Sequence, residues 1–430
     1  MPRIFTSFLF LSLLTVLLWA FPAPAPARID IDITAAELRK IVVAVPNFVN
    51  SSTPGQVEEQ GVRMADLLSR ALEVHGFIRV IPAKTYGGGQ QNDWTSLGAE
   101  LVVLGQYGRE GNDTVLELRV NDAASGRQVL GRRYRNSPEQ TRQAVLKFCD
   151  ETILTLTGEM GISQTSIAFV SEMNGIKEIY LADLLGDQLR RITRHNRLAL
   201  SPRFTTDGRE LSYTSYHRNN PNLYLTELAQ DKVTRPISQR AGLNMAPAWH
   251  PDGQTMAVTL SPKGNADLFL MDRNGKILEQ LTMGEGLNVS PTWSPDGTKL
   301  AFVSDRSGKP QIYVLNLKTR QLKRLTYQGT YNTTPAWSPK GDLIAYSGSH
   351  ERNYQIYLIN PDGGTPTQIT SGPGNHESPS WSPDGRQIVF SRTLDGHSKI
   401  CAVFRNGTGQ RVLFDGKGEE SMPQWSPRTR

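Results

Sequence analysis

Hydrophobic and polar positions follow one pattern that recurs along the second half of the chain. Each copy begins with a proline and places an aromatic residue two positions later; four copies continue with Ser-Pro, and five contain a turn that ends in glycine. Successive copies lie 44 or 45 residues apart, and five of the seven tryptophans occupy the aromatic position. A fixed period of this length indicates a repeat architecture. The copies begin at Pro202, Pro247, Pro291, Pro335, Pro379 and Pro423.

Each repeat unit is predicted to form four short strands. In one copy, the turn at Asp296-Gly297 leads into a strand from Lys299, and further strands begin near Gln311 and Gln321. An Asp-Gly pair between apolar runs is a strong hairpin signal. Four strands in about 40–45 residues is the size of one β-propeller blade. A solenoid agrees less well, because helical and leucine-rich repeats would not place a turn after every strand.

The two ends of the repeat region complement each other. A copy of the second strand starts at Ser166 with no Pro-x-Trp motif before it, and the motif at Pro423 has no second strand after it. We therefore predict six blades, one of which combines three strands from about Thr165 to Thr193 with an inner strand at 422–426. Such a closure leaves no exposed sheet edge. The repeated tryptophans are interpreted as packing between blades.

The region before the repeats mixes helical and strand periodicity. Helices are predicted over Gln56–His75 and from an N-cap at Ser137 to about Gly158. Strands are predicted to start at Lys40, Phe77, Ala99, Thr114 and Arg127. We expect an α/β domain over residues 37–160, followed by an all-β, six-bladed propeller over residues 163–430.

The first 27 residues have the features of an export signal. A single arginine precedes an apolar stretch from Ile4 to Phe21, and Ala25 and Ala27 form an A-x-A site that predicts cleavage before Arg28. A retained membrane anchor is the alternative, because the apolar stretch approaches a spanning length. Residues 28–36 are expected to form a flexible tail on the exported protein.

Composition and charge narrow the classes of function. The chain has 38% hydrophobic and 20% charged residues, as folded proteins do. Its formal net charge of +6 comes from basic residues spread singly, without a polybasic arm, which argues against nucleic-acid binding. The two cysteines, Cys149 and Cys401, are too few for a disulfide scaffold or a cysteine-based zinc site. One bridge between them stays open.

The sequence lacks the common catalytic and cofactor motifs. It holds no G-x-S-x-G elbow, no H-E-x-x-H and no G-x-x-x-x-G-K-[ST] loop, and its seven histidines are scattered. We therefore expect no enzyme activity, no cofactor and no metal site. A propeller can gather ligands from several blades at its axis, so a bound cation there stays open. The competing hypothesis is a propeller enzyme or sugar-binding protein that uses the channel.

The export signal, the small α/β domain and the six Pro-x-Trp units together resemble the TolB family of the Tol–Pal envelope system. Stretches from Ile41, Trp94 and Leu156 are similar to that family too, whereas the last helix of the α/β domain lacks a histidine that such chains often carry. The resemblance implies a monomeric periplasmic scaffold that supports outer-membrane integrity and envelope constriction at cell division. It further implies that the propeller binds the lipoprotein Pal and that the N-terminal tail binds TolA. The implied tail residues are Arg28, Ile29, Asp30, Ile31, Asp32 and Ile33.

Strand parity gives an independent prediction of the binding face. In a four-stranded blade, the second-to-third and blade-to-blade connections share one face, and here they are longer than the connections of the other face. Long loops on a rigid ring commonly carry binding residues. The chain enters the ring at Thr165 from the short-turn face, so the α/β domain is expected opposite this mouth. The predicted mouth residues are Leu243, Asn244, Met245, Ala246, Leu287, Asn288, Val289, Ser290, Tyr331, Asn332, Thr333, Thr334, His376 and Glu377.

Overall fold

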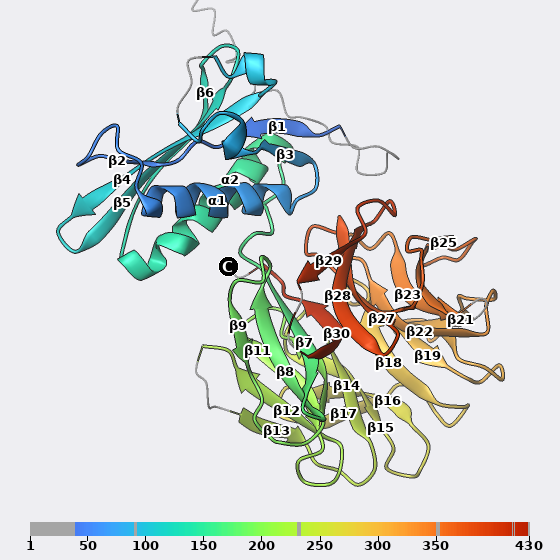
Figure 1. Cartoon of the computed structure of the whole chain (residues 1–430). Coiled ribbons are helices and arrows are strands. Elements are labelled where there is room, and N and C mark those ends of the chain that lie inside the picture. Colours follow the sequence, from blue (N-terminus) through green and yellow to red (C-terminus); the bar gives the residue numbers. More distant parts are fainter. Residues whose placement is uncertain are drawn as a thin grey trace, which may run out of the picture.

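The computed structural model describes residues 39–89, 93–229, 234–349, 353–414, 416 and 418–428. The predicted export signal and N-terminal tail lie outside the described residues. Figure 1 shows an α/β domain followed by a β-propeller, in which the last strand of the chain returns to the first strands of the ring. The predicted fold class is therefore confirmed.

The N-terminal domain is a mixed sheet with two helices on one face (Figure 1). Its elements are β1 (Ile41–Ala44), β2 (Val49–Asn50), α1 (Glu59–Glu73), β3 (Ile78–Ile81), β4 (Leu101–Glu110), β5 (Asp113–Asp122), β6 (Gln128–Asn136) and α2 (Thr141–Thr157). The strand order is β3-β1-β4-β5-β6, with parallel pairs around β1 and antiparallel pairs from β4 to β6. Apolar side chains of both helices, such as Leu68 and Phe148, share one core with the sheet.

Both helices begin later than the sequence predicts. The residue before α1, Glu58, turns its carboxylate to the Tyr107 hydroxyl, which donates a hydrogen bond at 2.7 Å, and this contact holds the preceding residues in a loop. Before α2, Pro138–Gln140 form a 3-10 turn, and the predicted cap residue Ser137 forms no side-chain cap bond. The α-helix itself starts at Thr141.

Within the described part of the chain, the propeller has six antiparallel sheets of four strands each. From the axis outward, blade 1 contains β30 (Glu419–Trp425), β7 (Ser166–Met173), β8 (Ile176–Asp183) and β9 (Leu189–Arg191). Blade 2 contains β10 (Ala199–Phe204), β11 (Glu210–Ser215), β12 (Asn222–Glu227) and β13 (Thr234–Ser238). Blade 3 contains β14 (Asn244–Trp249), β15 (Thr255–Leu260), β16 (Asp267–Asp272) and β17 (Ile277–Gln280).

The remaining three blades repeat the same order. Blade 4 contains β18 (Asn288–Trp293), β19 (Lys299–Ser304), β20 (Gln311–Asn316) and β21 (Leu322–Arg324). Blade 5 contains β22 (Tyr331–Trp337), β23 (Ile344–Ser349), β24 (Tyr354–Ile359) and β25 (Thr367–Gln368). Blade 6 contains β26 (Asn375–Trp381), β27 (Gln387–Leu394), β28 (His397–Phe404) and β29 (Arg411–Phe414).

The ring closes as the sequence predicts. Strand β30 pairs antiparallel with β7, with Trp425 opposite Ile167 and Glu419 opposite Glu172. The Ser426 amide also donates to the Ser166 carbonyl at 2.9 Å. The C-terminal segment therefore supplies the innermost strand of the blade that begins the ring.

The repeated tryptophans join neighbouring blades. The indole of Trp249 in blade 3 donates to Ser212 of blade 2 at 3.0 Å, and the indole of Trp293 in blade 4 donates to the Ala248 carbonyl of blade 3 at 2.9 Å. Each ring also lies in a core cluster that contains side chains of the adjacent blade. Packing between blades is therefore confirmed as the role of these residues.

Candidate functional site

The N-terminal domain is attached to the short-turn face of the propeller, so the long-loop face is the free mouth. The side-chain amide of Gln387, which follows the first turn of blade 6, donates to the Val74 carbonyl after α1 at 2.9 Å. Gly76 lies directly against Phe404, before the last turn of the same blade. This placement agrees with the prediction that the α/β domain lies opposite the mouth.

A cluster of ion pairs clamps both helices to blade 1. The Arg70 guanidinium of α1 binds both oxygens of Asp187, each at 2.9 Å, in the turn between β8 and β9. Arg142 of α2 binds the same carboxylate at 2.8 Å and also pairs with Asp183. Hydrogen bonding to Arg70 lowers the pKa of Asp187 below its usual value, with Arg142 acting in the same direction. The two domains are thus held by bidentate contacts of the stronger kind.

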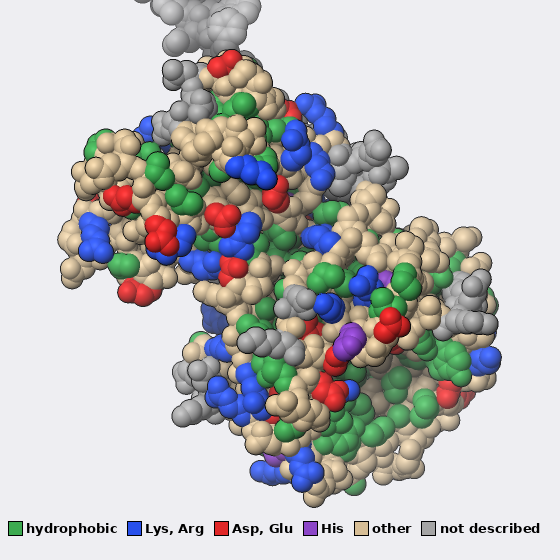
Figure 2. Space-filling view, viewed as in Figure 1, with side chains coloured by type: hydrophobic (Ala, Val, Ile, Leu, Met, Phe, Trp, Pro, Cys, Tyr) green, Lys and Arg blue, Asp and Glu red, His purple; other side chains and the backbone are tan. Residues whose placement is uncertain are grey.

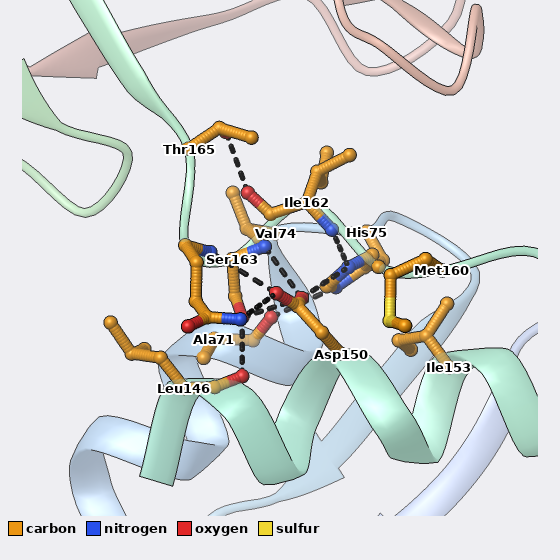
Figure 3. A network of polar contacts seen from close by, with 12 residues as sticks. Ala71, Val74, His75, Leu146, Asp150, Ile153, Met160, Ile162, Ser163 and Thr165 are labelled. Atoms are coloured by element: carbon orange, nitrogen blue, oxygen red, sulfur yellow. Dashed lines mark hydrogen bonds and ion pairs between the residues drawn. The ribbon is translucent and has the colours of Figure 1, made fainter. Parts of the chain in front are cut away.

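A buried carboxylate fixes the linker between the domains (Figure 3). Asp150 of α2 is 3% exposed, and it accepts hydrogen bonds from the amide and the hydroxyl of Ser163 at 2.8 and 2.7 Å. The side-chain amide of Gln164 donates to its other oxygen at 3.0 Å. With the Gln164 amide, which donates at 3.3 Å, four hydrogen bonds to one carboxylate hold the chain in place where it leaves the first domain and enters β7.

His75 links the end of α1 to the same segment. Its Nδ1 lies 2.9 Å from the Ala71 carbonyl, and the Ile162 amide donates to its Nε2 at 3.1 Å (Figure 3). A carbonyl only accepts, so Nδ1 carries the proton, Nε2 is the acceptor, and the imidazole is neutral. Burial lowers the pKa of His75, although the charge of nearby Asp150 opposes the shift.

The fourteen predicted mouth residues divide into four groups in the structure. Leu287 and Tyr331 are exposed at 48% and 44%. Thr333 and Glu377 are half-buried, and burial raises the pKa of Glu377. Six line a cavity on the axis, namely Leu243, Met245, Ala246, Val289, Ser290 and Thr334. The other four, Asn244, Asn288, Asn332 and His376, have no exposed surface.

The side chains of the buried asparagines form hydrogen bonds inside the protein. This corrects the expectation that these side chains contact a partner. The Asn288 amide donates to Asp267 at 2.9 Å, and Asp267 also accepts from Thr282 at 2.9 Å. Asn332 forms the same arrangement with a glutamine and a threonine of blade 4. Each set joins the third strand, the end of the fourth strand and the start of the next blade. These bonds hold the blade-to-blade loops in one conformation.

Six residues around the axis have a left-handed backbone conformation. In every blade the residue before the repeated proline has a positive φ, between 49° and 58°, and the inner strand shifts register at that point. Such a bulge places two successive side chains on one side of the strand. The conformation costs about 1–2 kcal/mol for a residue with a Cβ. The six residues are Ser201, Ala246, Ser290, Thr334, Ser378 and Met422.

Replacing Ala246 by glycine is therefore expected to stabilise the propeller, or at least not to weaken it. Relief of the left-handed strain is worth about 1–2 kcal/mol, and the extra chain entropy of glycine returns about 0.5–1 kcal/mol of it. The matched control is Ala248→Gly two positions later, without a positive φ, which should lower the free energy of unfolding by about 1 kcal/mol. Urea unfolding followed by tryptophan fluorescence measures both, and equal destabilisation by the two variants would contradict the strain argument.

The axial cavity has a volume of about 760 Å³ and is walled by the repeated motif itself. Its lining contains the tryptophans and both prolines of the Pro-x-Trp-Ser-Pro units of blades 4, 5, 6 and 1. In the space-filling view, hydrophobic side chains gather around a hollow in the lower part of the propeller (Figure 2). The lining is mostly apolar, and it extends from Leu243 and Met245 on the mouth side to the Ser-Pro turns on the short-turn side.

Beside the cavity, the mouth carries an exposed apolar rim formed by Met283, Leu287, Tyr327 and Tyr331. Their exposed fractions run from 44% to 76%, and they come from the two neighbouring connections between blades 3, 4 and 5. The Arg324 guanidinium lies 4.7 Å from the Tyr327 ring centre. Met283 and Tyr327 are not among the predicted mouth residues, although both lie in long connections of the predicted binding face.

A basic cluster formed by Arg194, Arg197 and Arg218 lies on the mouth side of blade 2. All three are exposed, and within the described residues none forms an ion pair. Between them the rings of His195 and His217 stack at 4.4 Å, and burial lowers the pKa of both histidines. The basic residues of these two loops were visible in the sequence, but their proximity was not.

Other candidate chemistry is sparse in the described part of the chain. Cys149 and Cys401 are free and buried, so the bridge that the sequence left open is not formed. The described residues include no group of three or more histidine, cysteine or acidic side chains placed to hold a metal ion. None of the described helices has the length and apolar character needed to cross a bilayer.

Comparisons with known proteins agree with this architecture. The family model of the TolB beta propeller domain matches residues 154–429, and that of the TolB amino-terminal domain matches residues 29–129. The crystal structure of TolB from Acinetobacter baumannii superposes with a TM-score of 0.78 over 93% of this chain and 99% of that one. At 24% identity, this likeness concerns the fold.

Two curated relatives, both described as Tol-Pal system protein TolB, are similar in sequence. The protein of Desulfotalea psychrophila is 46% identical over 243 residues, which is 56% of this chain and 56% of that protein. The protein of Desulfosudis oleivorans is 36% identical over 283 residues, 63% of this chain and 64% of that protein. The matched region thus spans less than two thirds of either relative. Because the propeller model alone covers more than half of the sequence, the chain belongs to the TolB family.

Proposed function

We propose that the protein is a periplasmic interaction scaffold of a Tol–Pal system, which binds the lipoprotein Pal at the propeller mouth and supports outer-membrane integrity and envelope constriction at division. The observation that carries the proposal is the apolar rim of Met283, Leu287, Tyr327 and Tyr331 on the free face of the ring. Exposed aromatic and methionine side chains are enriched where proteins bind each other. No reaction step is proposed.

The mouth is suited to a folded partner because its loops are pre-organised. Hydrogen bonds of the buried side chains of Asn244, Asn288 and Asn332 fix the loops before binding. Little conformational entropy is therefore lost when a partner docks. The basic cluster on blade 2 adds a positive field on another side of the mouth. Opposite charge on the partner would speed its association.

The N-terminal tail is proposed to bind TolA, which would place the second partner away from the mouth. The tail, residues 28–36, and the cleavage site before Arg28 lie outside the described residues. They stay predictions, as does the division of the chain at residues 37–160 and 163–430. The attachment of the α/β domain to the short-turn face supports a separation of the two partner sites.

Leu287→Arg and Tyr331→Arg are expected to weaken capture of the purified Pal domain about 30-fold or more each, because truncating or charging a central apolar contact commonly costs about 2 kcal/mol or more. Asn288 is unsuitable for this test although it was predicted at the mouth, because its side chain is buried and a substitution there would disturb the fold. The control is Leu278→Arg on the outer strand β17, where the side chain is 47% exposed. Calorimetric titration measures the affinities, and unchanged binding by both rim variants would refute the proposed site.

A further inference from the structure

Among the described residues that line the axial cavity, one is charged. Arg203 of β10 lines it at the position between the proline and the aromatic residue of the repeat. The equivalent residues of the other blades, which also line the cavity, are Ala248, Thr292, Ala336, Ser380 and Gln424. The other five blades therefore have small or neutral residues at this position of the repeat, and the packing of the inner strands does not require an arginine there.

Arg203 has no counter-ion among the described residues. The only hydrogen bond that its side chain donates within them goes from Nη1 to the Pro202 carbonyl at 2.9 Å. Burial lowers the pKa of its guanidinium to about 10, and no carboxylate opposes the shift. A half-buried cation without a partner destabilises the protein that holds it. A residue that destabilises the fold in this way is commonly retained because it serves a function.

The walls around Arg203 are those of a ligand site. A volume of about 760 Å³ lies in the range of small-molecule pockets, which are mostly apolar with a few polar groups that fix orientation. Proline and tryptophan rings supply the apolar surface, and Ser201, Ser290 and Ser378 place hydroxyls in the lining. The rigid inner strands hold these groups before any ligand arrives.

We propose that the axial cavity binds an elongated, largely apolar ligand through one carboxylate, which pairs with Arg203. The guanidinium matches a carboxylate in shape and offers two parallel donors. A phosphate monoester would bring close to two negative charges against a single cation, which disfavours it in apolar surroundings. A metal cation is disfavoured because the positive charge of the Arg203 guanidinium would repel it. The carboxylate could belong to a free organic acid or to the C-terminus of a peptide.

The test compares ligands that differ only in charge. Hexanoate and hexanamide are titrated into the full mature protein, as are the tetrapeptide Ala-Pro-Ala-Phe with a free C-terminus and its C-terminal amide. We expect at least one acid to bind about 10-fold or more tightly than its amide, and Arg203→Ala to abolish the difference. Preference for the peptide acid identifies a chain terminus as the source, and preference for hexanoate identifies a free acid. Equal binding of acids and amides to the wild-type protein, or a difference that survives Arg203→Ala, would overturn the proposal.

Stability separates a binding role from a structural role. Arg203→Ala installs the residue of blades 3 and 5, and its melting temperature should equal or exceed that of the wild type. Arg203→Gln keeps a polar side chain that can reach Pro202, and it too should lose the preference for the acid. If both variants melt well below the wild type, Arg203 is structural and the proposal fails. Capture of the Pal domain by these variants should be unchanged, so that this outcome is independent of the rim.

Discussion

Deletion of residues 422–430 is expected to lower the melting temperature of the protein by about 10 °C or more. The deleted segment holds most of the inner strand of blade 1, including Trp425, which is 2% exposed. The Trp425 indole donates to Thr165 at 2.8 Å, and its amide donates to Ser380 of blade 6 at 3.0 Å. Loss of one buried tryptophan alone costs about 3–5 kcal/mol, and a domain of this size loses about 2–4 °C per kcal/mol.

The deletion should also open the propeller ring between blades 6 and 1. Without residues 422–425, the inner edge of β7 loses its pairing with Gln424 and Trp425, and the contacts of Trp425 no longer join blades 6 and 1. Scanning fluorimetry measures the melting temperature, and limited trypsin digestion should show early cleavage in blade 1. The control is Trp337→Ala in blade 5, which removes a similar side chain but leaves the chain of the ring closed. A deletion variant as stable as this control would mean that closure adds nothing.

The repeat made the propeller predictable from the sequence. A period of 44 residues, with an Asp-Gly turn after most aromatic positions, determines the number of strands per blade. The unmatched strand at Ser166 and the unmatched motif at Pro423 then place the closure, which the pairing of β30 with β7 confirms. These features recur at a fixed spacing, and the side chain at the aromatic position is buried in every copy.

The mouth was less predictable because the bulge changes which side chains face the axis. The prediction placed all residues before each proline at the channel mouth. Side chains of a regular strand alternate between its two faces. Here Asn288 is buried outside the cavity lining, whereas the next two residues, Val289 and Ser290, both line the cavity, and Ser290 has a left-handed backbone conformation. No sequence signal marks the positive φ, since Ser, Ala, Thr and Met all occur there. Arg203 could not be predicted from the sequence either. The residue at its position differs between the copies of the repeat, so nothing in the sequence distinguishes a functional arginine from ordinary variation.

Contacts between the two domains are the part that the sequence could not reveal. His75 and Ile162 meet across 87 positions, and Gln387 meets Val74 across 313. No periodicity links such residues. The buried Asp150 was therefore not singled out, although it is the most heavily bonded carboxylate at the junction. Its substitution tests whether the junction is a rigid unit.

Asp150→Ala is expected to lower the free energy of unfolding by about 2–4 kcal/mol and to expose the linker at residues 158–165 to proteases. The substitution leaves the buried amide of Ser163 without its acceptor and removes the bond from the Ser163 hydroxyl, and an unpaired buried donor costs about 1–3 kcal/mol. The neighbouring His75 bond to Ile162 depends on the same linker path and should loosen with it.

Glu151→Ala is the matched control for this variant, because it removes the adjacent carboxylate of the same helix. Glu151 pairs with Arg132 of β6, whose side chain is 46% exposed, and a pair of this partly exposed kind contributes about 1 kcal/mol. Urea unfolding and trypsin cleavage are measured for both variants, together with the radius of gyration by small-angle X-ray scattering. A rigid junction predicts a larger radius for Asp150→Ala only. If both variants keep the wild-type radius and linker protection, the ion-pair clamp at Asp187 is sufficient to hold the domains, and the buried carboxylate serves local stability alone.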